Sequence, residues 1–179
     1  GEDVLVTGAG PIGIMCAALA SHAGARNVVL TDVSDYRLSL ASSLGTPRLT
    51  TVNTTERSLE EVRGNLSIRE GFDVGLEISG APEAVRSMLR ACTHGARIAM
   101  LGLPKTSYAI DWGWVITHML TIQGVYGREM FDTWYKASPT LRDAVRGVIT
   151  HRFPADQWEQ GFEAARSGRC GKVVLDWTV

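Results

Sequence analysis

Three glycines near the start of the chain have the spacing of a phosphate-binding turn. Gly8, Gly10 and Gly13 form the pattern Gly-x-Gly-x-x-Gly, directly after the apolar residues 4–7. The first glycine permits a tight turn, the second lets a pyrophosphate approach the backbone, and the third lets a following helix pack closely on a sheet. The free N–H groups at the start of that helix would then face the phosphates. Alone the pattern is weak evidence, because small residues also serve simple tight packing.

Asp32 strengthens this interpretation. It follows the predicted strand 27–31 and lies 19 residues beyond Gly13, where a carboxylate can accept hydrogen bonds from both hydroxyls of an adenosine ribose. Its charge would repel a 2′-phosphate, which favours NAD over NADP. Arg37 could stack on the adenine or hold the ribose edge, and it would pull toward a 2′-phosphate. The alternatives are that Asp32 caps the next helix and that Arg37 is a solvated helix residue.

Strand patterns and helix patterns alternate along residues 1–127, and these elements must position the residues named above. Several apolar runs are continuous, which is typical of strands buried on both faces of a parallel sheet. Helical patterns separate them, so we predict an α/β fold with a doubly wound, six-stranded parallel sheet of the Rossmann type. The strands are predicted at residues 4–7, 27–31, 49–53, 73–78, 97–101 and 121–126, and the helices at residues 12–23, 36–44, 82–93 and 112–120.

The loops after the last three strands complete the predicted cofactor site. Ligands of open α/β sheets bind outside the carboxyl ends of the strands, where these loops begin. Glycines there would let backbone approach a ligand. Each loop alone resembles an ordinary turn, but together they predict a cofactor track. Its residues are Ser79 and Gly80, then Leu101, Gly102, Leu103 and Pro104, and finally Val125, Tyr126 and Gly127.

The pattern changes at about residue 128, so we predict a dinucleotide-binding domain over residues 1–127 and a C-terminal α/β tail over residues 128–179. The tail has helical patterns at residues 130–145 and 154–168 and short strands at residues 148–153 and 172–177. Pro139 interrupts the first helical pattern, so one helix and two are equally consistent with it. The tail would form only a partial layer by itself. We expect its strands to complete a sheet whose other members lie outside the chain.

Composition excludes several classes of function. The chain has 179 residues and a net charge of -1, which gives no support for binding nucleic acid or an anionic membrane. No run of about 18 apolar residues is present, so no membrane span is expected. The predicted protein is soluble and cytoplasmic. We assign no catalytic residue and no metal ligand, because the candidate ligands are scattered: Cys16, Cys92, Cys170, His22, His94, His118 and His151.

Two longer stretches point to a particular family. "EGFDVGLEISGAP" and "GVYGREMFDTWYK" resemble the corresponding stretches of L-threonine 3-dehydrogenases, which are zinc-dependent medium-chain dehydrogenases that use NAD. The resemblance covers nearly the whole chain and is weakest over residues 46–69. It implies oxidation of the β-hydroxyl of L-threonine to 2-amino-3-oxobutanoate, with hydride transfer to NAD.

The resemblance also implies roles for single positions. Ile12 matches the residue that lies against the dinucleotide, and Asp32 and Arg37 match the adenosine-ribose contacts. Leu101, Gly102 and Leu103 match the loop beside the nicotinamide ribose, whereas Val125 and Tyr126 match the nicotinamide end.

The family further implies a separate N-terminal domain that supplies the zinc ligands and most substrate contacts. We therefore expect zinc in the full-length enzyme only, and no dehydrogenase activity in this chain alone. Related enzymes pair the edge of the sixth strand across a dimer and assemble as tetramers. A homo-oligomer is therefore expected, a tetramer at full length and a dimer for this chain alone.

Three alternatives remain open on the sequence. A sibling zinc dehydrogenase acting on a polyol or another alcohol would share the fold and the glycine pattern. A short-chain dehydrogenase is disfavoured, because no Tyr-x-x-x-Lys pair is present. A non-catalytic nucleotide-binding module, or a methyltransferase-like fold that binds another adenosine ligand, would also place an acid at the end of the second strand.

Overall fold

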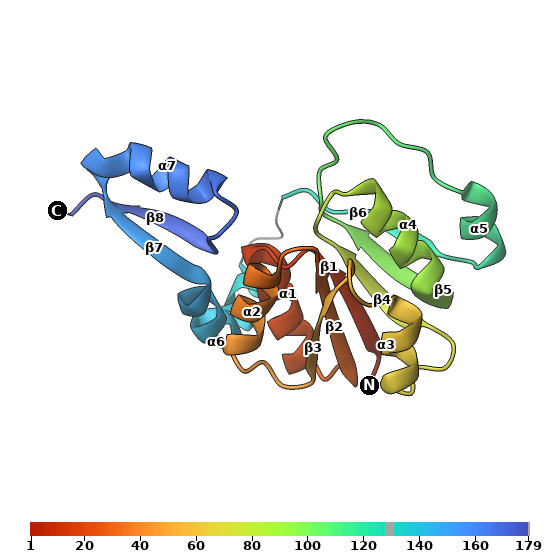
Figure 1. The fold of residues 1–179 in the computed structure, drawn as a ribbon. Coiled ribbons are helices and arrows are strands. Elements are labelled where there is room, and N and C mark those ends of the chain that lie inside the picture. Colours follow the sequence, from red (N-terminus) through yellow and green to blue (C-terminus); the bar gives the residue numbers. More distant parts are fainter. Residues whose placement is uncertain (128–130, 179) are drawn as a thin grey trace.

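Six parallel strands form the central sheet of the computed structural model, which describes residues 1–127 and 131–178 (Figure 1). Their order is β3-β2-β1-β4-β5-β6, so the chain winds outward in both directions from β1. This confirms the predicted doubly wound Rossmann sheet. The strands are β1 (Asp3–Thr7), β2 (Asn27–Asp32), β3 (Leu49–Asn53), β4 (Phe72–Glu77), β5 (Cys92–Met100) and β6 (Thr121–Gly124).

Helices cover both faces of this sheet, and a separate hydrophobic core lies under each set. Leu5 and Val29 point to the core beneath α3, α4 and α5, whereas Val6 and Leu30 point to the core beneath α1 and α2. Burial on both faces explains why these strands are continuous apolar runs. The helices are α1 (Pro11–His22), α2 (Asp35–Ser43), α3 (Leu59–Asn65), α4 (Pro82–Ala91) and α5 (Trp112–Thr117).

The register of the sheet brings the ends of neighbouring strands level. Thr7 at the end of β1 pairs with Thr31 on β2 and with Glu77 on β4. Glu77 in turn pairs with Met100, the last residue of β5. The loops that leave these strands therefore start side by side along one edge, where ligands of this fold bind.

Helix α3 corrects the sequence prediction, which assigned no helix between β3 and β4. Ser58 precedes this helix, and its hydroxyl accepts a 3.1 Å hydrogen bond from the backbone N–H of Glu61. Ser58 and Glu61 have the Ser-x-x-Glu spacing of a capping box, a signal that could have predicted the helix. Leu59 and Val62 then bury one side of this short helix in the core.

Several predicted boundaries were wrong by a few residues. Helix α4 ends at Ala91, because Cys92 is already extended and pairs with Phe72 as the first residue of β5. Helix α5 ends at Thr117, since Met119 adopts a positive φ of 52° that no α-helix contains. Strand β6 ends at Gly124, so Val125 and Tyr126 lie in the loop beyond it.

The C-terminal residues form a second, smaller sheet. Strands β7 (Ile149–Pro154) and β8 (Lys172–Asp176) pair in parallel, and α7 (Trp158–Arg166) connects them after the short 3₁₀ turn η1 (Ala155–Gln157). Helix α6 (Asp132–Val148) precedes them as a single helix with Pro139 inside it, so one helix and not two is found here.

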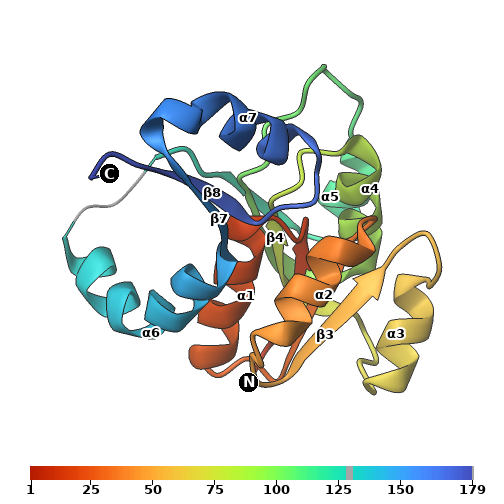
Figure 2. The ribbon, with the colours of Figure 1, turned by 60° about the vertical axis from the view of Figure 1, so that its left-hand side comes forward.

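Helix α6 attaches this second sheet to the first one. It packs along α1, and Val148 at its end is buried in the core beneath α1 and α2 (Figure 2). Residues 128–130, at the predicted boundary of the tail, lie outside the described residues. No helix of the described chain has both the length and the apolar character needed to cross a bilayer.

Candidate cofactor site

A cleft of about 590 Å³ lies at the carboxyl ends of β1 and β2, against the first turns of α1 and α4. Six of the predicted cofactor residues line it, namely Gly8, Gly10, Ile12, Asp32, Arg37 and Ser79. The structure thus brings the glycine turn and the carboxylate together, although they are far apart in the sequence. The other lining residues are Thr7, Pro11, Thr31, Val33, Thr54, Leu59, Ile78, Ala81, Glu83, Ala84 and Ser87.

The three glycines of the turn meet different surroundings. Gly8 has a φ of 95°, which favours glycine, and its N–H donates a 2.8 Å hydrogen bond to the carbonyl of Thr31. A Cβ atom at Gly13 would overlap the carbonyl oxygen of Gly8, so this position needs glycine for close packing. A Cβ atom at Gly10 would meet no atom within 4 Å. The protein itself does not require glycine at position 10, and the open space is where a ligand would fit.

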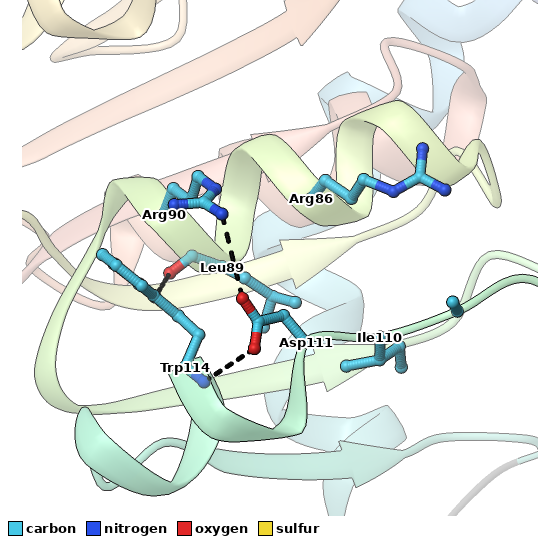
Figure 3. Close-up of a pocket in the computed structure, with 7 residues that line it drawn as sticks. Arg86, Leu89, Arg90, Ile110, Asp111 and Trp114 are labelled. Atoms are coloured by element: carbon cyan, nitrogen blue, oxygen red, sulfur yellow. Dashed lines mark hydrogen bonds and ion pairs between the residues drawn. The ribbon is translucent and has the colours of Figure 1, made fainter.

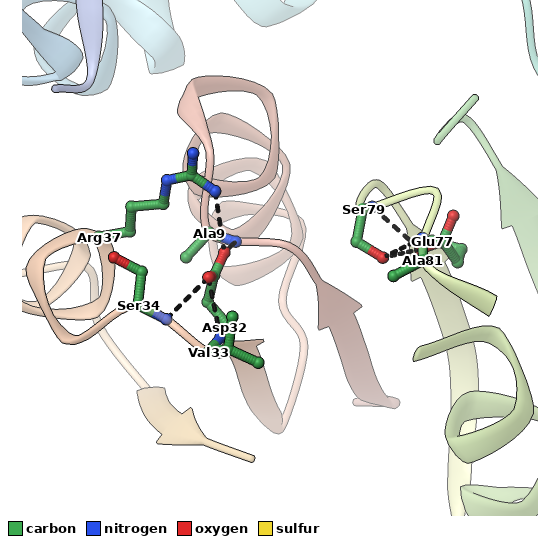
Figure 4. Close-up of polar contacts among 8 residues, drawn as sticks. All are labelled: Ala9, Asp32, Val33, Ser34, Arg37, Glu77, Ser79 and Ala81. Carbon is green, nitrogen blue, oxygen red and sulfur yellow. Dashed lines mark hydrogen bonds and ion pairs between the residues drawn. The ribbon is translucent and has the colours of Figure 1, made fainter. Parts of the chain in front are cut away.

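The carboxylate of Asp32 is held at the end of β2 by backbone donors (Figure 4). One of its oxygens accepts hydrogen bonds of 2.8 and 3.0 Å from the N–H groups of Val33 and Ser34, and the other accepts one of 2.7 Å from Ala9. The bond to Ala9 ties Asp32 directly to the glycine turn. The side chain is only 6% exposed, so its position is well defined.

The alternative of Asp32 as a helix cap does not match this geometry. Helix α2 begins at Asp35, and the residue at its N-cap is Ser34. Asp32 accepts from Ser34 itself and not from the N–H groups of the first helical turn. An Asp32 that bridges two loops at the edge of the sheet is what a nucleotide site needs.

Arg37 reaches the same cleft from α2. Its guanidinium lies 3.7 Å from the carboxylate of Asp32, and its side chain is 40% exposed. The two charges offset each other at short range, and Figure 4 shows the arginine turned toward the carboxylate. Arg37 therefore presents less positive charge to a 2′-phosphate than a free arginine would.

The predicted residues that follow β5 and β6 lie at the same edge of the sheet but outside the cleft. The N–H groups of Leu101 and Gly102 both donate to the carbonyl of Glu77, and the N–H of Val125 donates to the carbonyl of Met100. Leu103 is 76% exposed and Tyr126 is 92% exposed. These residues follow β5 and β6, on the side of β1 opposite to Asp32.

Some residues of the cleft were missed by sequence reasoning. Thr54 follows β3, and the rule that ligands bind at the carboxyl ends of strands, applied there, would have predicted it. Glu83, Ala84 and Ser87 form a helix face of α4 toward the cleft, for which the sequence carries no separate signal. Glu77 is fully buried behind Ser79 at the end of β4, a placement that depends on tertiary packing.

A second pocket, of about 330 Å³, lies between α4 and α5 (Figure 3). Arg90 lies 3.8 Å from Asp111, and Trp114 donates a 3.0 Å hydrogen bond from Nε1 to the carbonyl of Leu89. Asp111 also caps α5 by accepting from the N–H of Trp114. These contacts fasten α5 to α4, and none of the predicted cofactor residues lines this pocket.

The candidate metal ligands stay apart. Within residues 1–127 and 131–178, no three His, Cys, Asp or Glu side chains are placed to hold a metal ion. The three cysteines are free thiols, and burial raises the pKa of Cys92 to about 12. These positions show no chemistry of their own.

Comparisons with known proteins agree with the fold. The family model of zinc-binding dehydrogenases matches residues 11–143. L-Threonine 3-dehydrogenase of Burkholderia ambifaria is 57% identical over 100% of this chain and 52% of its own length. The same enzyme of Yersinia pseudotuberculosis is 56% identical over 99% of this chain and 52% of its own length.

Among solved structures, an alcohol dehydrogenase from Thermotoga maritima is similar with a TM-score of 0.85 and 26% sequence identity. The match covers 98% of this chain and 50% of that one. The chain thus spans about half the length of the relatives that it matches. The chain has the fold and the glycine turn described above, and the family model matches more than half of its residues. This chain therefore belongs to the zinc-binding dehydrogenase family.

Proposed function

We propose that the chain is the NAD-binding portion of a zinc-dependent L-threonine 3-dehydrogenase. The observation that carries the proposal is the carboxylate of Asp32, fixed at the end of β2 and joined to the glycine turn through the N–H of Ala9. The identity of 57% to a threonine dehydrogenase supports the choice of reaction.

The residues of the cleft fit the parts of NAD in order. Asp32 would accept hydrogen bonds from the adenosine ribose, and the space at Gly10 would admit the pyrophosphate close to the backbone. The N-terminus of α1 begins at Pro11, so its free N–H groups and positive dipole end would stabilise the phosphates. Ile12, which is 55% exposed, would cover the dinucleotide. When bound, NAD supplies the acceptor for a hydride.

The remaining predicted residues would hold the other end of the cofactor. Strand order places β4, β5 and β6 successively beyond β1, so a ligand that starts at Asp32 and crosses the glycine turn continues toward their loops. Leu101, Gly102 and Leu103 would then lie beside the nicotinamide ribose, and Val125 with Tyr126 beside the nicotinamide.

The substrate and the zinc in this proposal are inferred from the relatives. L-Threonine and a catalytic zinc would be held by a domain that corresponds to the other half of those enzymes. In this division, residues 1–127 are the cofactor domain and residues 128–179 belong to the catalytic lobe. Both outer edges of the β7–β8 sheet are unpaired within the described residues, which supports further strands joining it.

The proposal extends to assembly and location. Strand β6 is the last strand of the sheet on its side, and Thr121, Gln123 and Gly124 in it are exposed. We propose that this edge forms a dimer contact within a homo-oligomer, a tetramer in the full-length enzyme. We further propose a cytoplasmic protein with no nucleic-acid or membrane partner.

A pair of assays on the purified chain tests this function. We expect NADH to bind, seen as enhanced nicotinamide fluorescence in a titration, because the cleft and its carboxylate are preformed. We expect no oxidation of L-threonine by the chain with added zinc and NAD, since a catalytic zinc needs about three convergent protein ligands. The full-length enzyme of Burkholderia ambifaria is the positive control for turnover. Absence of NADH binding, or turnover by the chain alone, would contradict the proposal.

A further inference from the structure

Glu77 is a fully buried acidic residue at the end of β4, and the function proposed above does not use it. Its side chain is 0% exposed. Burying a carboxylate is costly unless its oxygens are hydrogen-bonded. Within the described residues it forms no ion pair with any Lys, Arg or His. The cost must therefore be offset by uncharged donors.

Such donors surround the carboxylate on the side of the cofactor loops. Oε1 accepts hydrogen bonds of 2.9 Å from the N–H of Ser79 and 3.1 Å from the N–H of Gly80, and the hydroxyl of Ser79 donates to it as well. Thr7 donates a weaker bond of 3.2 Å from its hydroxyl. Figure 4 shows Ser79 folded back onto Glu77. An ionised carboxylate only accepts hydrogen bonds, so its chemistry matches this set of donors.

The loop after β5 depends on the same residue. The backbone carbonyl of Glu77 accepts hydrogen bonds of 2.8 Å from Leu101 and 2.9 Å from Gly102. A Cβ atom at Gly102 would lie 2.5 Å from Oε2 of Glu77, and one at Gly80 would lie 2.5 Å from the carbonyl oxygen of Leu103. The two loops therefore pack against each other through glycines, with the carboxylate of Glu77 between them.

We propose that Glu77 is a positioning residue for the nicotinamide half of the cofactor. This rests on the NAD function proposed above. Its carboxylate fixes the loop after β4, and that loop fixes the one after β5 by direct packing. The adenosine half depends on it less, because Asp32 is held by Val33 and Ser34 and the N–H of Gly8 donates to Thr31. The contact between the two halves is the packing of Gly8 against Ser79.

This division predicts an unequal effect of Glu77→Gln on two ligands. The amide keeps the size of the side chain but replaces one acceptor oxygen by an N–H₂ donor. At Oε1 this donor would face the N–H groups of Ser79 and Gly80, and at Oε2 it would face that of Gly80, which lies 3.1 Å from Oε2. We expect affinity for NAD to fall about tenfold or more, the scale of losing a hydrogen bond to a charged group. Affinity for AMP, which occupies only the adenosine half, should change less than about twofold.

The experiment is a calorimetric titration of the chain and its variants with NAD and with AMP. Glu163→Gln makes the same chemical change on an exposed face of α7 and should alter neither affinity. Asp32→Ala should weaken both ligands. Ser79→Ala removes one donor but keeps the carboxylate, so its loss of NAD affinity should be smaller than that of Glu77→Gln. Unchanged NAD affinity in Glu77→Gln, or an equal fall for both ligands, would overturn the proposal.

Amide hydrogen exchange tests the positioning role of Glu77 separately from the proposed NAD function. Without any ligand, Glu77→Gln should speed exchange at Ser79 and Gly80 by about tenfold, because their acceptor is weakened, while Gly8 and Ala9 stay protected. Unchanged exchange at Ser79 and Gly80 would refute the positioning role, whatever the ligand results. Faster exchange in a chain that binds no NAD would instead refute the proposed function, and with it the role toward the nicotinamide.

Discussion

Gly13→Ala is expected to lower the free energy of unfolding by about 3 kcal/mol and to remove most of the affinity for NAD. The new Cβ atom would overlap the carbonyl oxygen of Gly8, a backbone atom that no rotamer change can move away. Helix α1 must therefore shift from the sheet, and the turn that faces the cleft shifts with it. In a chain of this size the loss corresponds to a fall in Tm of about 6–12 °C, measurable by circular dichroism.

Gly10→Ala is the matched control for this prediction. Its Cβ atom would meet no protein atom within 4 Å, and Gly10 has an extended φ of -72° that alanine tolerates. Stability should fall by no more than about 1 kcal/mol, the difference between glycine and alanine at the N-cap of α1. Affinity for NAD should still drop about tenfold, because the methyl group fills the space left for the pyrophosphate. Loss of stability in Gly10→Ala without a loss in Gly13→Ala would contradict this account of the turn.

Asp32→Ala is expected to weaken NAD binding by roughly 1–3 kcal/mol, the cost of losing hydrogen bonds to a charged group. In the parent chain Arg37 lies 3.7 Å from the carboxylate of Asp32, so the variant leaves the guanidinium without an opposing charge. Binding of NADP should therefore improve relative to NAD, since a 2′-phosphate would find a free guanidinium. Calorimetric titrations with both cofactors measure the two effects together.

Asp35→Ala is the control for the loss of one negative charge. Asp35 lies three residues on, at the start of α2, and is exposed with a hydrogen bond to Asn53. Removing this carboxylate changes the net charge equally but leaves the cleft intact. Its affinity for NAD should remain that of the parent chain. A dissociation constant for NAD that is the same in Asp32→Ala and the parent would exclude the ribose role of Asp32.

The sheet could be predicted from the sequence because its strands have a recognisable residue pattern. Residues such as Leu5 and Val6 are buried on opposite faces, which leaves continuous apolar runs that no amphipathic helix shows. Element ends were less predictable. The end of α5 depends on the positive φ of Met119, and that of α4 on the pairing of Cys92 with Phe72. Neither leaves a local sequence signal.

The residues of the candidate site also differ in how far the sequence could predict them. Gly8, Gly10 and Asp32 could be placed together because their spacing follows from one turn, one helix and one strand. The role inferred for Glu77 could not be predicted. Strands β2 and β8 also end in an acidic residue, and only the packing of Gly80 and Gly102 around Glu77 shows that it is buried among loop N–H groups.

The choice between NAD and NADP tests the central claim most directly. Titration of the unmodified chain with each cofactor in a calorimeter, with S-adenosylmethionine as a third ligand, measures all three affinities under one condition. The account predicts that NAD binds at least about tenfold more tightly than NADP, because the carboxylate of Asp32 repels a 2′-phosphate. Equal or tighter binding of NADP, or heat from S-adenosylmethionine alone, would contradict it.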